Sequence, residues 1–213
     1  RFKNLHNHKP AEGVTSKSLL ERGLRAQIEK TLNSASIDGD HERWAAILRF
    51  QLAWDVWPIA PADKMKEPED NFKDAIRVQR EGGHLTELAE SLNGLGELYK
   101  KSAVHARDVE KNSATATENF NLSRSCHEEA IQIRRQSPYT LVNGGLAQSL
   151  NSLGALCNVE NDKHMADVIL TQALELYSAV GGPFFPKTLT VMNALANIYR
   201  ESGKRANALA LIA

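Results

Sequence analysis

A nine-residue pattern occurs three times in this chain. The segments SLNGLGELY, SLNSLGALC and VMNALANIY align without a gap on Asn93, Asn151 and Asn193. Internal similarity at intervals of roughly 20 to 50 residues is typical of proteins built as a stack of similar units, because one such unit cannot bury its apolar face alone. This repeat constrains the fold more strongly than any other feature of the sequence.

Each copy of the pattern predicts an amphipathic helix. Apolar and small residues recur at i, i+3, i+4 and i+7, which lie on one helix face. In the first copy these residues are Leu92, Leu95, Gly96 and Tyr99. A glycine in mid-helix costs up to about 1 kcal/mol relative to alanine. We therefore expect the small residue, which is Gly154 in the second copy, to allow close approach of a neighbouring helix.

A second recurring element supplies that neighbour. The segments AIRV, AIQI and ALEL begin at Ala75, Ala130 and Ala173, and each is followed by a turn-rich stretch before the next Asn-containing helix. In the clearest unit Asn151 precedes Asn193 by 42 residues. The sequence therefore predicts an all-α fold of alternating helix pairs.

Composition limits the classes of function. The 26 basic residues balance the 26 acidic ones, so the net charge gives no reason to expect nucleic acid as a partner. No apolar run approaches the roughly 20 residues that span a bilayer, so we expect no membrane insertion. Cys126 and Cys157 are too few for a disulfide framework or a four-ligand zinc site, and we expect both to be packing residues. The histidines include His6 and His8, yet no metal-ligand spacing recurs on one helix. The sequence predicts no cofactor, no metal site and no catalytic residue.

The repeat residues resemble the tetratricopeptide repeat, in the 42-residue variant found in kinesin light chains and nephrocystin-3. The resemblance covers roughly Glu69 to Ala213, and AQSLNSLGALCN is especially similar to nephrocystin-3-like repeats. The residues that match are Leu150, Leu153, Gly154 and Cys157 in the first helix, and Ala166, Leu170 and Ala173 in the second. Pro186 matches the proline of a turn that usually reads His-Pro, with Phe185 in place of the histidine. The resemblance implies a right-handed superhelical solenoid with a concave binding surface.

The resemblance also suggests how the chain is organised. We expect an N-terminal helical or capping segment over 1–36, with Leu20, Leu24, Ile28 and Leu32 on one stripe, and about four repeat units over 37–213, the last one truncated. An insertion near 101–117 predicts either elongated helices or a protruding loop.

Two further expectations concern single positions. The unit with the insertion carries Ser123 and His127 where an alanine and a larger apolar residue are usual. The aromatic residues Phe50, Trp44, Trp54 and Trp57 are expected in the core of the N-terminal helices.

Residues one step off the packed face form a second stripe on each first helix. In the family these positions line a peptide groove, and here they include Glu90, Asn93, Glu97, Lys100, Gln148, Asn151, Asn158, Asn193, Asn197 and Arg200. A side-chain amide both donates and accepts, so it can pair with the backbone of an extended peptide. The same asparagines can instead bond to neighbouring helices and fix the superhelix. The sequence leaves both interpretations open.

The resemblance implies a non-enzymatic scaffold whose partner is a protein or an extended peptide segment within a larger assembly. The first specific hypothesis is a ciliary or microtubule-associated adaptor similar to nephrocystin-3, located in the cytoplasm and in particular at the cilium or cytoskeleton. The alternatives are a cargo adaptor similar to kinesin light chains, and the sensor arm of a larger signalling ATPase.

Overall fold

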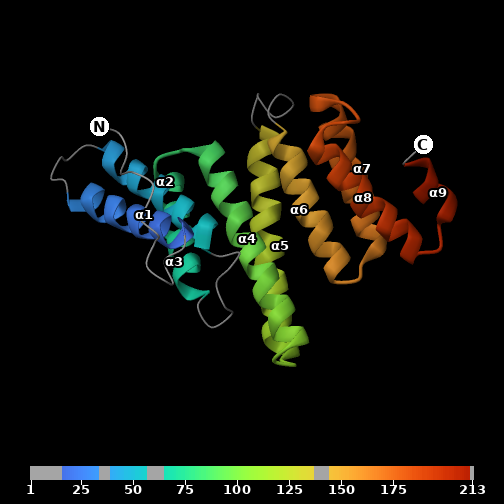
Figure 1. Ribbon diagram of the computed structural model, residues 1–213, viewed down its shortest axis with the longest axis horizontal. Coiled ribbons are helices and arrows are strands. Elements are labelled where there is room, and N and C mark those ends of the chain that lie inside the picture. The colour runs from blue at the N-terminus through green and yellow to red at the C-terminus, as the bar shows by residue number, and fades with distance from the viewer. Residues whose placement is uncertain (1–15, 34–38, 57–64, 137–143, 212–213) are drawn as a thin grey trace, which may run out of the picture.

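The computed structural model describes residues 16–33, 39–56, 65–136 and 144–211. Within these ranges every regular element is an α-helix (Figure 1). In chain order the helices are α1 (Ser16–Asn33), α2 (Gly39–Val56), α3 (Lys66–Glu81), α4 (Leu85–Asp108), α5 (Ser113–Gln136), α6 (Gly145–Val159), α7 (Lys163–Gly181), α8 (Pro186–Glu201) and α9 (Arg205–Ala210). The fold is an all-α solenoid.

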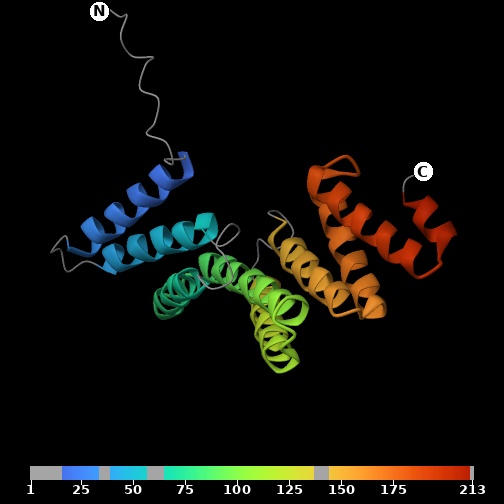
Figure 2. The same ribbon diagram turned by 60° about the horizontal axis from the view of Figure 1, so that its bottom comes forward.

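Successive helices pack as pairs: α2 with α3, α4 with α5, α6 with α7 and α8 with α9. The first helices of neighbouring pairs also contact one another, α2 with α4, α4 with α6 and α6 with α8. We call the side formed by these four helices the inner surface, and the side formed by α3, α5 and α7 the outer surface. In Figure 2 both ends of the stack rise on the same side of its middle, and α2 and α4 lie nearer that side than α3 and α5.

Glycines let the two helices of a pair approach closely. A Cβ atom added at Gly154 in α6 would lie 2.6 Å from Cγ of Leu170 in α7, and one added at Gly96 in α4 would lie 2.6 Å from the ring of His127 in α5. Real Cβ atoms do not come this close to another heavy atom. The prediction that Gly154 permits close helix packing is confirmed.

The apolar core follows these contacts along the stack. One cluster runs from α4 to α8, and its least exposed members include Leu156, Leu170, Leu195 and Val191. A second joins α2, α3, α4 and α5 around Phe72 and Leu98. Each pair therefore buries its apolar face against the next pair, which is how solenoids are stabilised.

The insertion near 101–117 lengthens both helices of its pair. Helices α4 and α5 each have 24 residues and extend beyond the other pairs (Figure 1). The side chain of Asn112 accepts a hydrogen bond from the backbone N–H of Thr115 at 3.1 Å, which caps the start of α5. Arg107 donates to the carbonyl oxygen of Val159 at the end of α6 (2.8 Å) and lies over the ring of Phe120. These contacts hold the elongated helices against the next pair.

An aromatic contact forms at the turn between α7 and α8. Phe185 comes directly before Pro186, the first residue of α8. Its ring centroid lies 6.3 Å from that of Tyr177 in α7.

The N-terminal helices differ in part from expectation. Ile28 of α1 is buried, whereas the side chains of Leu20, Leu24 and Leu32, the boundary at 36/37 and Trp57 lie outside the described residues. The expectation that Trp44 and Trp54 belong to the core is wrong, because they are 60% and 37% exposed. The face of α2 that is buried carries smaller residues, which are Ala45, Ala46, Leu52 and Ala53.

We predict that Gly154→Ala destabilises the protein. Overpacking against Leu170 costs about 1 to 3 kcal/mol of unfolding free energy, which outweighs a helix-propensity gain of up to about 1 kcal/mol. Gly23→Ala in α1 is the matched control, because a Cβ there meets nothing within 4 Å. Urea unfolding of both variants measures the contrast. Equal stability of the two would contradict close packing at Gly154.

Candidate binding surface

The structure places the ten predicted groove residues at different depths. On α4, Glu90 is exposed, Glu97 and Lys100 are half-buried and Asn93 is buried. On α6, the half-buried residues are Gln148, Asn151 and Asn158. On α8, the exposed residues are Asn193, Asn197 and Arg200. Side chains at equivalent positions of the repeat therefore have different access to a ligand.

Asn93 lies inside the junction between two pairs and not on the inner surface. Its side chain is 2% exposed. Its Nδ2 donates to Oγ of Ser149 in α6 at 2.9 Å, and its Oδ1 lies 3.2 Å from Nδ1 of His127 in α5. Both polar atoms of the amide are thus bonded inside the protein, and burial keeps the side chain from a peptide. Asn93 therefore bonds to neighbouring helices, as in the second of the two interpretations of the repeated asparagines.

His127 occupies the space that Gly96 leaves open. Its ring is fully buried, and Ser123, one turn before it on α5, donates to the carbonyl oxygen of Gly96 at 2.8 Å. Because Oδ1 of Asn93 is an acceptor, Nδ1 of His127 carries the proton and donates. Ser123 and His127, which replace the usual small and apolar residues, therefore both lie against Gly96 where α4 meets α5.

The other ring nitrogen of His127 has no hydrogen-bond partner within the described residues. Nε2 lies 3.9 Å from Oε1 of Glu97. Burial lowers the pKa of His127 to about 4, although the carboxylate of Glu97 acts in the opposite direction and Lys100 lowers the pKa further. The imidazole is therefore neutral at pH 7.

A buried arginine completes the polar junction. Nη1 of Arg134 in α5 donates to Oγ of Ser149 at 2.9 Å and to the carbonyl oxygen of Gly145. One chain of hydrogen bonds thus links Arg134, Ser149, Asn93 and His127 across α4, α5 and α6. We call these four residues the polar junction. Sequence reasoning missed Arg134 and Ser149, and the departure at His127 was the available signal.

A similar polar contact joins α3 to α4. Gln79 and Ser91 are 2% and 0% exposed. In the amide orientation that satisfies both of its atoms, Nε2 of Gln79 donates to Oγ of Ser91 at 2.8 Å. Serines two residues before the repeated asparagine thus accept hydrogen bonds from the preceding pair at both junctions.

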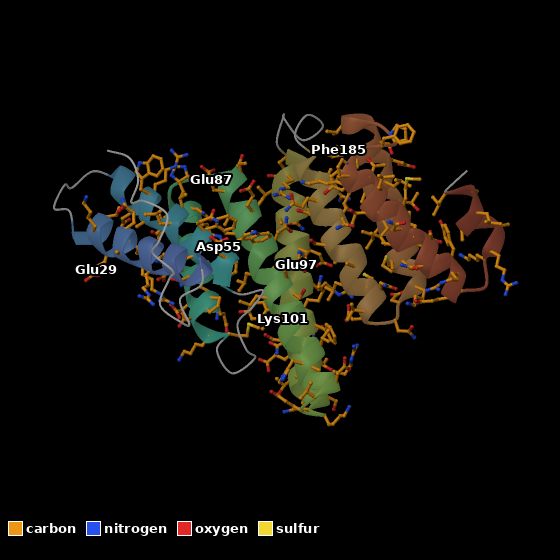
Figure 3. The ribbon with its side chains drawn as sticks, viewed as in Figure 1. Glu29, Asp55, Glu87, Glu97, Lys101 and Phe185 are labelled. Carbon is orange, nitrogen blue, oxygen red and sulfur yellow. The ribbon has the colours of Figure 1, made fainter. Side chains whose placement is uncertain are left out.

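Three of the predicted groove residues, Glu97, Lys100 and Asn158, already have partners inside the protein. Nζ of Lys100 lies 2.5 Å from Oε2 of Glu97, and the two half-buried groups neutralise each other. Figure 3 shows Glu97 in the middle of the stack. Oδ1 of Asn158 accepts a hydrogen bond from Lys163 at 2.7 Å, and Lys163 also bridges to Glu201 of α8.

The remaining amides form the accessible part of the inner surface. Gln148 and Asn151 on α6, and Asn193 and Asn197 on α8, have no side-chain hydrogen-bond partner within the part of the chain that the structure describes. Pairs of residues three or four positions apart lie on the same helix face. Both helices therefore present spaced amides, and Arg200 adds a cation at the end of α8.

The histidines, carboxylates and cysteines of the described ranges do not form a cluster typical of a metal site. No group of three or more metal-ligating side chains occurs there, and His6 and His8 lie outside these ranges. Burial raises the pKa of the Cys126 thiol to about 12 and also raises that of Cys157. Both cysteines are thus thiols at neutral pH. None of the described helices is long and apolar enough to cross a bilayer.

Comparison with known proteins identifies the type of fold. The chain matches no family model and no curated protein sequence. It resembles the crystal structure of BtubC (BKLC) from P. vanneervenii, a kinesin-light-chain-like protein of the tetratricopeptide type, with a TM-score of 0.69 and 18% sequence identity over 92% of this chain and 70% of that one. The chain has a tetratricopeptide-type helical repeat fold. At this identity the likeness concerns the fold and not the subfamily.

We predict different effects for two equivalent asparagines. Asn93→Ala leaves the buried Nδ1 of His127 without a partner and removes one of the two donors to Oγ of Ser149, which costs about 1 to 3 kcal/mol of unfolding free energy. Asn193→Ala removes an exposed amide and changes it by less than about 0.5 kcal/mol. Chemical denaturation of both variants measures the difference. A cost at Asn193 as large as at Asn93 would show that the two amides are alike.

We also predict acid sensitivity from His127. The unfolded chain binds its proton near the ordinary pKa of 6.5 and the folded protein only near 4, so stability falls as the pH drops through this window. At pH 5 this group alone lowers the unfolding free energy by about 2 kcal/mol relative to pH 7. His127→Gln removes this dependence, whereas exposed His164→Gln keeps it. Unchanged pH dependence in His127→Gln would refute the assignment.

Proposed function

We propose that the chain is a non-enzymatic scaffold that binds an extended protein segment along its inner surface. The observation that carries this proposal is the set of accessible amides on α6 and α8. Side-chain amides without internal partners are available to a ligand, and each offers two donors and an acceptor. An extended segment presents backbone N–H and C=O groups that match them.

Preorganisation supports the same proposal. The polar junction fixes α6 against α4 and α5, so the amides of α6 are already spaced before a ligand arrives. A rigid site does not lose conformational freedom of its own on binding, which favours affinity. Glu90 on α4 and Arg200 on α8 are exposed, and they favour a segment whose charges are arranged in the complementary order.

Two cellular roles are compatible with such a scaffold. The similarity of AQSLNSLGALCN to nephrocystin-3-like repeats favours a ciliary or microtubule-associated adaptor. The fold likeness to BtubC, a kinesin-light-chain-like protein, favours an adaptor of the kinesin-light-chain type as the second candidate. In both roles the molecular act is the same, since the scaffold holds a partner protein and performs no reaction.

Affinity capture with matched variants tests the inner surface. We predict that the double variant Asn193→Ala and Asn197→Ala reduces recovery of specific partners at least tenfold, because each lost amide removes hydrogen bonds to the partner. Gln172→Ala and Glu175→Ala, at exposed positions of α7, should leave recovery unchanged. Quantitative mass spectrometry of the captured proteins provides the readout.

Circular dichroism must show the same melting temperature, within a few degrees, for both double variants. Full recovery with the α8 variant, or equal loss with both variants, would contradict binding at the inner surface.

A further inference from the structure

A cleft of about 370 Å³ opens on the outer surface, away from the inner-surface amides. Its floor is apolar and consists of Ile76 of α3 and Leu92 and Leu95 of α4, all of which are almost completely buried. We call it the outer cleft.

Cations dominate the α3 wall of the outer cleft. Lys73, Arg77 and Arg80 line it at spacings of three and four residues, so they project from one face of the helix. The carboxylate among the lining residues is that of Glu81. An apolar floor below a row of cations suits a ligand that is apolar at its centre and acidic at its ends.

Two of these cations pair with carboxylates of their own helix. Lys73 donates to Glu69 at 2.6 Å and Arg77 donates to Glu81 at 3.0 Å, both within one turn of α3. The side chains of Lys73 and Arg77 are each 53% exposed. Exposed pairs of this kind contribute little to stability. A carboxylate of a partner can therefore replace Glu81 beside Arg77 at small cost. Glu69 is only 27% exposed and also accepts a hydrogen bond from Tyr99, so a partner's carboxylate joins it at Lys73, whose ammonium has three N–H donors.

The third cation closes one end of the cleft. Arg80 donates to Glu129 of α5 at 2.6 Å, which connects α3 to the next outer helix. Cys126, on the same helix and packed against the same apolar cluster, is neutral because burial raises its pKa. On α5, Glu129 is thus paired with Arg80, and the Cys126 thiol adds no charge.

We propose that the outer cleft binds an acidic protein segment with one aliphatic side chain, which enters above Ile76, Leu92 and Leu95 while flanking carboxylates pair with Lys73 and Arg77. The site goes beyond the proposed function, because it lies on a different set of helices from the amides of α6 and α8. A scaffold with both sites holds two protein segments at once.

The apolar floor favours a protein segment over a polyanion. Ile76, Leu92 and Leu95 suit an aliphatic side chain, which has no counterpart in a nucleic-acid backbone. An acidic segment places its carboxylates only where Lys73 and Arg77 meet them.

Fluorescence anisotropy with a defined probe tests the proposal. The probe is a fluorescein-labelled peptide of sequence Glu-Asp-Leu-Asp-Glu, and its control has serine in place of leucine. We expect saturable binding of the probe, at least fivefold weaker binding of the control and weakening by added salt. Lys73→Glu with Arg77→Glu should reduce affinity at least tenfold, and the milder Arg77→Gln should reduce it in the same direction.

Lys66→Glu is the matched control, because Lys66 is exposed on α3 and does not line the cleft. It should keep affinity within twofold, and circular dichroism should show that all variants fold. Failure to bind the probe, equal loss in Lys66→Glu, or displacement of the probe by polyuridylate or phosphatidylserine vesicles would each overturn the proposal. Asn193→Ala with Asn197→Ala should leave probe binding intact, so failure at this site and failure at the inner surface are distinguishable.

Discussion

The arrangement of the stack depends on a buried contact between Asn93 and Ser149. This hydrogen bond joins α4 to α6, and the bonds of Ser149 to Arg134 and of Asn93 to His127 connect both helices to α5. Apolar packing alone tolerates small slides between helices, whereas a buried polar group without its partner is costly. The polar junction therefore selects one orientation of α6 relative to α4 and α5.

Position in the stack changes what an equivalent residue does. Asn93 is enclosed by α5 and α6 and has both of its polar atoms bonded. Asn151 on α6, which is also followed by further helices, is half-buried and has no side-chain hydrogen-bond partner within the described residues. A repeated asparagine thus stabilises the solenoid in one unit and offers a ligand contact in another. The outer cleft adds a surface of a different chemistry, built from cations and an apolar floor.

Local sequence patterns predicted the parts of the fold that local forces determine. Helical spacing of apolar residues predicted the pairs, and the mid-helix Gly154 predicted close packing against the second helix. How deeply a side chain is buried depends on helices that are distant in sequence. The burial of Asn93 could therefore not be derived from the pattern of its own helix. Trp44 illustrates the same limit, since α2 buries its alanines and leaves this ring exposed. The outer cleft likewise depends on how α3 packs against α4, which the pattern of either helix alone does not give.

Exchange of side-chain amide protons, measured by NMR, distinguishes a buried asparagine from an accessible one. We expect the Nδ2 protons of Asn93 to exchange with solvent at least a hundredfold more slowly than those of Asn193, because the first amide is buried among α4, α5 and α6 and the second is exposed. Equal exchange rates at the two asparagines would contradict the claim that one amide fixes the solenoid while its equivalent is available to a partner.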